Sequence, residues 1–136
     1  MPIRILAVGR LKEDFWTAAE AEYRKRLRRY ADVEVTEVKD DAALVAALPP
    51  RATVIALDER GDLVTSETLA REVLGRIAQP TFVVGGAEGL PEAVRARAAR
   101  LIAFGRITLP HRLARIVLLE QIYRGFTILR GEPYHK

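Results

Sequence analysis

The sequence contains no cysteine, a single serine and only two histidines among 136 residues. Without cysteine there can be no disulfide, thiolate metal site or cysteine nucleophile, and such a composition is typical of a reducing compartment such as the cytoplasm. Ser66 stands at a predicted helix start, outside any G-x-S-x-G motif, which indicates a cap rather than a serine hydrolase. His111 and His135 lack metal-ligand spacing, so we expect no metal.

Long hydrophobic runs are also missing. The apolar run in residues 3–9 is too short for a signal-peptide core, and no later run could span a bilayer. We therefore expect a cytoplasmic protein that has no contact with membrane. The length predicts one domain, residues 1–136, which can bury a core without a disulfide or metal.

The common nucleotide-binding motifs are absent as well. The sequence has no G-x-x-x-x-G-K-[ST] phosphate-binding loop. A dinucleotide fingerprint, G-x-G-x-x-G, follows the first strand of its fold, whereas glycines 85, 86 and 89 follow the fourth predicted strand and have Val84 in the leading position. Binding of NAD is therefore unsupported.

The sequence has 22 basic and 18 acidic residues, which gives a net charge of +4. Five of the basic residues lie within residues 24–29. The predicted helix 13–30 has its acids early and its cations late, which complements the helix dipole. A solvated basic face explains this segment, and so does a phosphate-binding surface.

Apolar segments of strand and helix period alternate along the chain. This order predicts an α/β fold with a parallel sheet, in which the alternating segment 33–38 lies near an edge. We expect a turn at Gly61 and Asp62, and a helix cap at Thr65 or Ser66. The predicted strands are 3–9, 33–38, 52–59 and 81–86, with 101–109 as strand or extended loop, and the predicted helices are 13–30, 40–48, 67–78, 91–100 and 112–130.

Ligands of open α/β sheets bind beyond the carboxyl ends of the strands. Three such ends stand out here, at Leu57–Glu59, Gly85–Gly89 and Phe104–Leu109. Three glycines within five residues favour a ligand or a second chain segment passing close to the backbone, although a tight turn would explain one of them. Glu88 is equally well explained as an acid at a helix start.

The last predicted helix is apolar around most of its circumference. A helix of this kind is buried on more than one side, so we expect a second subunit to cover part of it. Its polar exceptions are Glu120, Gln121 and Arg124, and the spacing of Glu120 and Arg124 predicts an ordinary intrahelical ion pair. The tail after this helix carries Tyr134 and His135.

Several of these segments together resemble one family. They are LD at 57–58, VVGGAEGL at 83–90, ITLPH at 107–111, IYRGF at 122–126 and PYHK at 133–136. Over essentially its whole length the chain resembles the ribosomal RNA large subunit methyltransferase H family of SPOUT-class methyltransferases. The resemblance implies a parallel-sheet SPOUT fold with a C-terminal trefoil knot, a homodimer, and bound S-adenosylmethionine. The implied reaction is methylation of N3 of a pseudouridine in 23S rRNA within the assembled 70S ribosome.

By motif, the resemblance also implies which residues contact the cofactor. Backbone N–H and C=O groups can read adenine, and the transfer needs no metal because the sulfonium is already cationic, so that positioning supplies much of the rate. Family members usually carry serine where Gly105 stands, so only backbone contact is expected there. The implied contacts are Leu57, Gly85, Phe104, Gly105, Arg106, Ile107, Thr108 and Leu109.

The target nitrogen must lose a proton whose pKa lies roughly two or three units above neutrality, so a base or a nearby cation would help. The implied catalytic residues are His111, Arg124, Tyr134 and His135. We expect Tyr134 and His135 to hold the target base, and Arg124 to contact phosphate or the base anion across the dimer. The proton acceptor is left open, since His111 is also explained as a helix-start residue.

Two other functions fit parts of the sequence. A non-catalytic RNA- or ribosome-binding module would use the cations at 24–29 and bind no cofactor. An enzyme that uses another nucleotide cofactor would bind NAD or ATP. The 104–109 motif and the PYHK tail disfavour both alternatives.

Members of the family that this chain resembles often have a longer and more basic segment in place of 39–52, so RNA affinity would depend more on residues 24–29.

Overall fold

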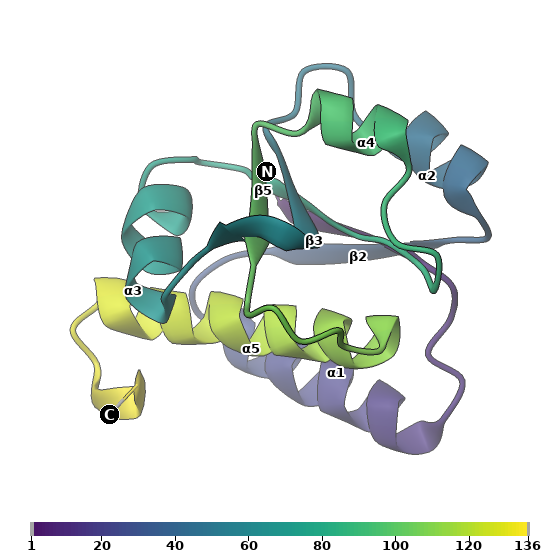
Figure 1. Ribbon diagram of the computed structural model, residues 1–136. Helices are drawn as coiled ribbons and strands as arrows, with labels where there is room; N and C mark the ends of the chain where they lie inside the picture. The colour runs from purple at the N-terminus through teal and green to yellow at the C-terminus, as the bar shows by residue number, and fades with distance from the viewer. Residues whose placement is uncertain (1, 136) are drawn as a thin grey trace.

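The computed structural model describes residues 2–135, with side chains up to Tyr134. Its centre is a sheet of parallel strands (Figure 1), as the alternating pattern predicted. The strands are β1 (Ile3–Val8), β2 (Val33–Val38), β3 (Val54–Leu63), β4 (Thr81–Val84) and β5 (Arg100–Ala103). Their spatial order is β2-β1-β4-β3-β5, so β2 is an edge strand as expected.

Helices cover both faces of the sheet. In Figure 1, α1 and α5 lie on one side, and α2 and α4 on the other. The helices are α1 (Asp14–Leu27), α2 (Asp41–Ala47), α3 (Ser66–Thr68), the π-helix η1 (Leu69–Leu74), α4 (Glu92–Arg97), α5 (His111–Leu129) and the 3-10 helix η2 (Pro133–His135). Within residues 2–135, none is both long and apolar enough to cross a membrane.

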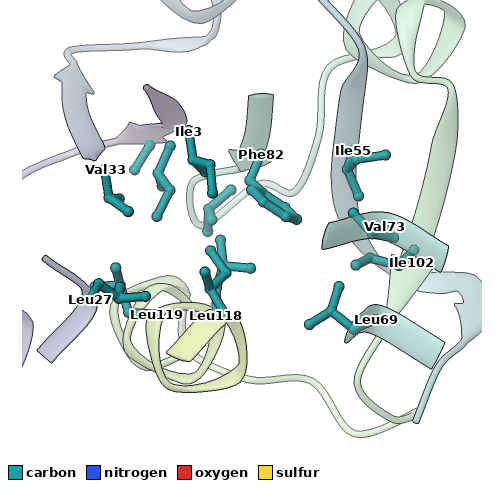
Figure 2. Packing of buried hydrophobic residues seen from close by; sticks show 14 of the residues in the cluster. Ile3, Leu27, Val33, Ile55, Leu69, Val73, Phe82, Ile102, Leu118 and Leu119 are labelled. Carbon is teal, nitrogen blue, oxygen red and sulfur yellow. The ribbon is translucent and has the colours of Figure 1, made fainter. Parts of the chain in front are cut away.

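Side chains from alternate strand positions form one apolar cluster on each face. Figure 2 shows the larger cluster, in which Ile3, Phe82 and Ile55 of the sheet face Leu118 and Leu119 of α5. The other cluster packs alternate strand residues such as Leu6 and Val83 against Leu44 of α2 and Val94 of α4. Each fully buried Leu, Ile or Phe contributes about 1.5–3 kcal/mol, so the continuous apolar runs of the strands stabilise both layers.

Strand β3 is longer than predicted. We expected it to end at residue 59 and the chain to turn at Gly61 and Asp62, but the strand continues to Leu63. Leu57 and Asp62 both pair with Ile102, so the residues between them form a bulge and the strand then rejoins β5. A Cβ on Gly61 would lie 2.6 Å from the Leu101 carbonyl oxygen. Gly61 is therefore required by close strand approach, and the predicted turn was wrong.

Several helix boundaries also differ from the predictions. Thr65 caps α3 by accepting from the Thr68 N–H at 3.0 Å, but the helix 67–78 ends at Leu74, in a π-helix. Pro91 is the residue before α4 rather than its first residue, and α4 ends at Arg97. Strand β5 ends at Ala103, which leaves a loop that leads to α5.

Helix α5 is covered largely by its own chain. It packs on α1, on β4, and on α3 and η1, and a Cβ on Gly125 would lie 2.5 Å from Leu74 Cδ1. The buried side chains include Ile116, Leu119, Ile122 and Ile128. Much of its apolar surface is thus explained within one subunit, and the homodimer stays a prediction.

Candidate cofactor and substrate site

The carboxyl ends of four neighbouring strands lie level with one another. Ala7 of β1 pairs with Val84 of β4, Ala56 of β3 pairs with Val83, and Leu57 pairs with Ile102 of β5. The residues that follow are Val8, Gly85, Asp58 and Ala103, which therefore share one edge. The sheet thus brings the predicted cofactor segments, at Leu57, Gly85 and Phe104–Leu109, to the same edge.

The glycines at 85, 86 and 89 form a tight turn on this edge. The Gly89 N–H donates to the Gly86 carbonyl at 3.0 Å, and Gly89 has a φ of +84°. A Cβ on Gly85 would lie 2.6 Å from the Gly89 carbonyl oxygen, and one on Gly86 would lie 3.0 Å from Val8 Cγ1. The chain itself therefore makes the close approach at Gly85 and Gly86, whereas Gly89 has no heavy atom within 4 Å of its Cβ position and is favoured by its positive φ instead.

Loop 104–109 is fastened to the bulge of β3. The Arg106 guanidinium donates to the carbonyls of Glu59 at 2.6 Å and Gly61 at 2.8 Å, and the Thr108 hydroxyl donates to the Glu59 carboxylate. Within residues 2–135, the backbone N–H and C=O groups of residues 105–109 make no hydrogen bond to protein. The loop is therefore held by side chains while its backbone is free to bind a polar ligand.

Asp58 is a buried carboxylate at the base of the bulge, and sequence reasoning gave it no role beyond the LD motif. Its side chain is 6% exposed, and Arg95 Nε of α4 lies 2.9 Å from its Oδ2. Burial would raise its pKa, but the Arg60 N–H, at 3.0 Å, and the Arg95 charge outweigh burial and lower the pKa. Asp58 is thus a fixed negative charge that ties β3 to α4.

His111 is the first residue of α5, as a helix-start role requires, and lies beside the end of β1. A Cβ on Gly9 would be 3.7 Å from His111 Nε2. Burial lowers the pKa of His111, and the charge of Arg112 lowers it further. The imidazole is therefore neutral near pH 7 and able to accept a proton at this edge.

Arg115 lies one turn after His111 in α5. No role was assigned to it from the sequence. It is 3% exposed, and its Nε lies 2.7 Å from Glu20 of α1 while its Nη1 lies 2.8 Å from Glu37 of β2. The helical spacing could have revealed it, because position 115 lies on the same buried face of α5 as Leu118, Leu119 and Ile122. An arginine on such a face needs acidic partners. These ion pairs join α5, α1 and β2 one helical turn after His111.

Arg124 and Tyr134 form a second group near the other end of α5. Both donate to Glu120 Oε2, Arg124 Nη2 at 2.7 Å and the Tyr134 hydroxyl at 2.9 Å. Burial, followed by this hydrogen bond, raises the pKa of Tyr134 to about 12. The predicted ion pair of Glu120 and Arg124 is confirmed, and the tail is docked on α5 by Tyr134. The side chain of His135 lies outside the described part of the chain.

The two groups of predicted catalytic residues are well separated within one chain. His111 and Arg124 lie on the same straight helix. At 1.5 Å per residue, their backbones are about 20 Å apart along its axis. One subunit therefore brings Arg124 and Tyr134 together but places His111 with the cofactor segments.

A protein-family model described as predicted SPOUT methyltransferase matches residues 1–135. The chain belongs to the SPOUT methyltransferase family. Members of the family use S-adenosylmethionine in general. The predicted fold class is thereby confirmed, while its C-terminal trefoil knot stays a prediction.

Two solved structures have a similar fold to this SPOUT methyltransferase. TrmJ from Z. mobilis ZM4 is 19% identical with a TM-score of 0.56, and the match covers 92% of this chain and 70% of that one. The tRNA (m1G37) methyltransferase from Aquifex aeolicus is 13% identical with a TM-score of 0.58, covering 91% and 70%. At these identities the likeness shows the fold alone.

The residues at the carboxyl edge fit S-adenosylmethionine. Residues 105–109 offer free backbone donors and acceptors of the kind that adenine requires, and Leu57 and Phe104 are half-buried apolar side chains at the same edge. Ile107 is 79% exposed, so an apolar side chain is presented where a ligand could cover it.

Proposed function

We propose that this SPOUT methyltransferase transfers a methyl group from S-adenosylmethionine to N3 of a pseudouridine in 23S rRNA of the assembled 70S ribosome. The observation that carries the cofactor assignment is loop 104–109. Its backbone polar groups at 105–109 make no hydrogen bond to the described part of the chain, and Arg106 fixes its position. The choice of RNA target is supported by the motifs at 107–111, 122–126 and 133–136, which resemble those of the large-subunit rRNA family.

The residues at the edge would bind and orient the cofactor. When bound, S-adenosylmethionine supplies a methyl group on a cationic sulfur. The backbone of 105–109 would bind the adenine edge, and Leu57 and Phe104 would exclude water from its faces. The turn at Gly85–Gly89 would close the site from the β4 side. Holding nucleophile and methyl in line supplies a large part of the rate enhancement.

The other group would hold the target base. Because the pKa of Tyr134 is raised to about 12, its phenol is protonated at neutral pH and acts as a hydrogen-bond donor rather than a base. Arg124 keeps its positive charge beside Glu120 and can stabilise an anionic pyrimidine. The lowered pKa of His111 keeps its imidazole neutral, so a ring nitrogen is free to accept the N3 proton. His135 remains assigned to base binding through the family motif.

The proposal includes a homodimer, which the separation of these groups supports if both act on one base. His111 and the cofactor edge lie about 20 Å from Arg124 along α5, too far for one small base to contact both. A second copy of the chain, placing its Arg124 and Tyr134 at the first copy's cofactor edge, would complete the site. We include in this proposal the C-terminal trefoil knot that the family resemblance implies.

Titration calorimetry with S-adenosylmethionine and S-adenosylhomocysteine tests the cofactor assignment. We expect saturable binding of both, followed by transfer of labelled methyl to ribosomes that lack the modification. Binding without transfer to ribosomes, but with transfer to another RNA, would overturn the target and keep the methyltransferase. A folded protein that binds neither ligand and still binds ribosomes would favour the non-catalytic RNA-binding module.

A further inference from the structure

Cations gather at the C-terminal end of α1. Lys25, Arg28 and Arg29 are exposed, and the Arg29 side chain is 65% exposed. Arg24 donates to the Val33 carbonyl at 3.2 Å, so it is held at the same end without being neutralised. Within residues 2–135, Lys25 and Arg28 form no ion pair. The end of α1 therefore carries uncompensated positive charge.

Two acids in the second half of α1, Glu20 and Glu22, are already paired with arginines. Glu20 is buried against Arg115, at 2.7 Å. Glu22 pairs with Arg26 at 2.8 Å, which neutralises one cation of the 24–29 segment. The helix dipole favours cations in a last turn by about 0.3–1 kcal/mol each, which explains why they are tolerated on α1. The dipole of α1 does not explain why α5 places a further cation, Arg130, beside them.

That cation is Arg130, which follows α5. Helices α1 and α5 lie side by side (Figure 1), and the Tyr30 ring stacks on Phe126 at 5.6 Å with an interplanar angle of 4°. The guanidinium carbons of Arg29 and Arg130 lie 5.0 and 5.2 Å from the centre of the Tyr30 ring. Guanidinium groups from both helices are thus held around one aromatic platform. We name Arg24, Lys25, Arg28, Arg29 and Arg130 the cationic end.

The cationic end adjoins the residues assigned to the target base. The Arg26 guanidinium carbon lies 5.3 Å from the Tyr23 ring centre and 5.7 Å from that of Tyr123. Tyr123 in turn meets Tyr134 edge to face at 4.7 Å. A continuous layer of arginine and tyrosine therefore connects the cationic end to Tyr134 and Arg124.

We propose that the cationic end binds the phosphates of RNA that flank the target nucleotide. The inference rests on the proposed function, because it assumes an RNA substrate at Tyr134. Within residues 2–135, one of these five cations forms an ion pair, Arg29 with Glu132 at 3.6 Å. Guanidinium forks match phosphate oxygens, and aromatic platforms with arginine suit unpaired nucleotides.

The test is the salt dependence of binding to assembled 70S ribosomes that lack the modification. We compare wild type with the double variant Arg28→Gln/Arg130→Gln. If both side chains contact phosphate, the slope of log affinity against log salt should fall by about 1.5, and low-salt affinity by about tenfold or more. Calorimetric affinity for S-adenosylmethionine should not change.

The matched control is Arg51→Gln/Arg76→Gln, which removes the same charge from exposed positions outside α1 and α5. Its salt slope should equal that of wild type. Equal loss in both double variants would show attraction by net charge alone and would overturn the inference, as would an unchanged slope in Arg28→Gln/Arg130→Gln. If the inference fails in either of these ways while cofactor binding and methyl transfer are normal, the proposed function still stands. The proposed function itself would be overturned if the wild-type protein did not bind S-adenosylmethionine.

Discussion

Tyr134 lies in the short segment after α5 and is docked on that helix. Its phenol donates to Glu120 at 2.9 Å, and its ring packs on Tyr123 and Arg124. Glu120 therefore holds together two residues assigned to the target base. It is a positioning residue, because its carboxylate is occupied by Arg124 and Tyr134.

Replacing Glu120 by glutamine tests this role. Without the carboxylate, the pKa of Tyr134 should fall from about 12 toward its ordinary value of 10. In wild type the folded-state pKa lies above the unfolded one, so this tyrosine's contribution to the free energy of unfolding is complete below pH 10 and is lost as pH rises through about 12. The decrease in the free energy of unfolding between pH 10 and about 12 should therefore be smaller in Glu120→Gln than in wild type.

Titration of ring-labelled tyrosine by NMR measures these pKa values. The control is Glu132→Gln, which removes the equivalent partner of Tyr30, at 2.8 Å, and should leave Tyr134 unchanged. A wild-type Tyr134 that titrates at its ordinary value would show that the tail is not docked in solution.

Arg106 offers a clean test of the cofactor loop. Arg106→Ala removes the hydrogen bonds to the carbonyls of Glu59 and Gly61, so the loop should lose its position and S-adenosylmethionine affinity should fall by about tenfold or more. Calorimetry measures the affinity. Tyr134→Ala should keep cofactor affinity and lower turnover, and Arg51→Ala should change neither. Equal loss of cofactor affinity in Arg106→Ala and Tyr134→Ala would contradict the separation of the two sites.

Gly85→Val would not test cofactor binding alone, because even a Cβ there would lie 2.6 Å from the Gly89 carbonyl oxygen. The substitution would therefore disrupt the turn itself. The sequence showed that something must approach these glycines, whereas only the folded chain shows that it is their own turn.

At the scale of elements, the bulge of β3 positions the site. It supplies the carbonyls that fasten Arg106, and it depends on Gly61, where β3 and β5 meet most closely. Gly61→Ala should therefore lower the free energy of unfolding by about 1–3 kcal/mol, since the added methyl group forces the strands apart. Denaturant unfolding measures this change.

The neighbouring variant Asp62→Ala serves as control, because Asp62 is exposed and its replacement should be close to neutral. Gly61→Ala should also weaken cofactor binding, since the loop is fastened to the same bulge. A fully stable Gly61→Ala protein would show that β3 and β5 separate without cost, and that the bulge is not a rigid support.

Element types were predictable, and element ends were not. Apolar runs identified β1, β2, β3 and β4, which are buried or, like β2, alternate at an edge, but they left 101–109 open as strand or extended loop. The end of β3 depends on pairing with β5, which is nearly forty residues later in the chain, so local patterns at Gly61 and Asp62 favoured a turn. Arg115 was missed for a similar reason, since its partners come from α1 and β2.

At the scale of the whole molecule, the distance along α5 predicts a shared site between two chains. Mixing Arg106→Ala chains with Tyr134→Ala chains should form hybrid dimers that contain one intact cofactor loop facing one intact Tyr134. With random exchange, activity at limiting cofactor should recover to about a quarter of wild type. Methyl transfer before and after subunit exchange measures it.

Each variant alone should remain a dimer by sedimentation, which separates loss of the site from loss of assembly. An exchanged mixture with no more activity than its components would place both groups of residues in one chain, or would show that the protein acts as a monomer.

The strand order also sets when the sheet can form during synthesis. Strands β1 and β2 can pair as soon as residue 38 is available, but β4 lies between β1 and β3 and is made last of the three. Until residue 84 leaves the ribosome, β1 and β3 each present an open, apolar strand edge. Such edges pair readily with other chains, so the nascent protein is most exposed to mispairing before β4 is complete.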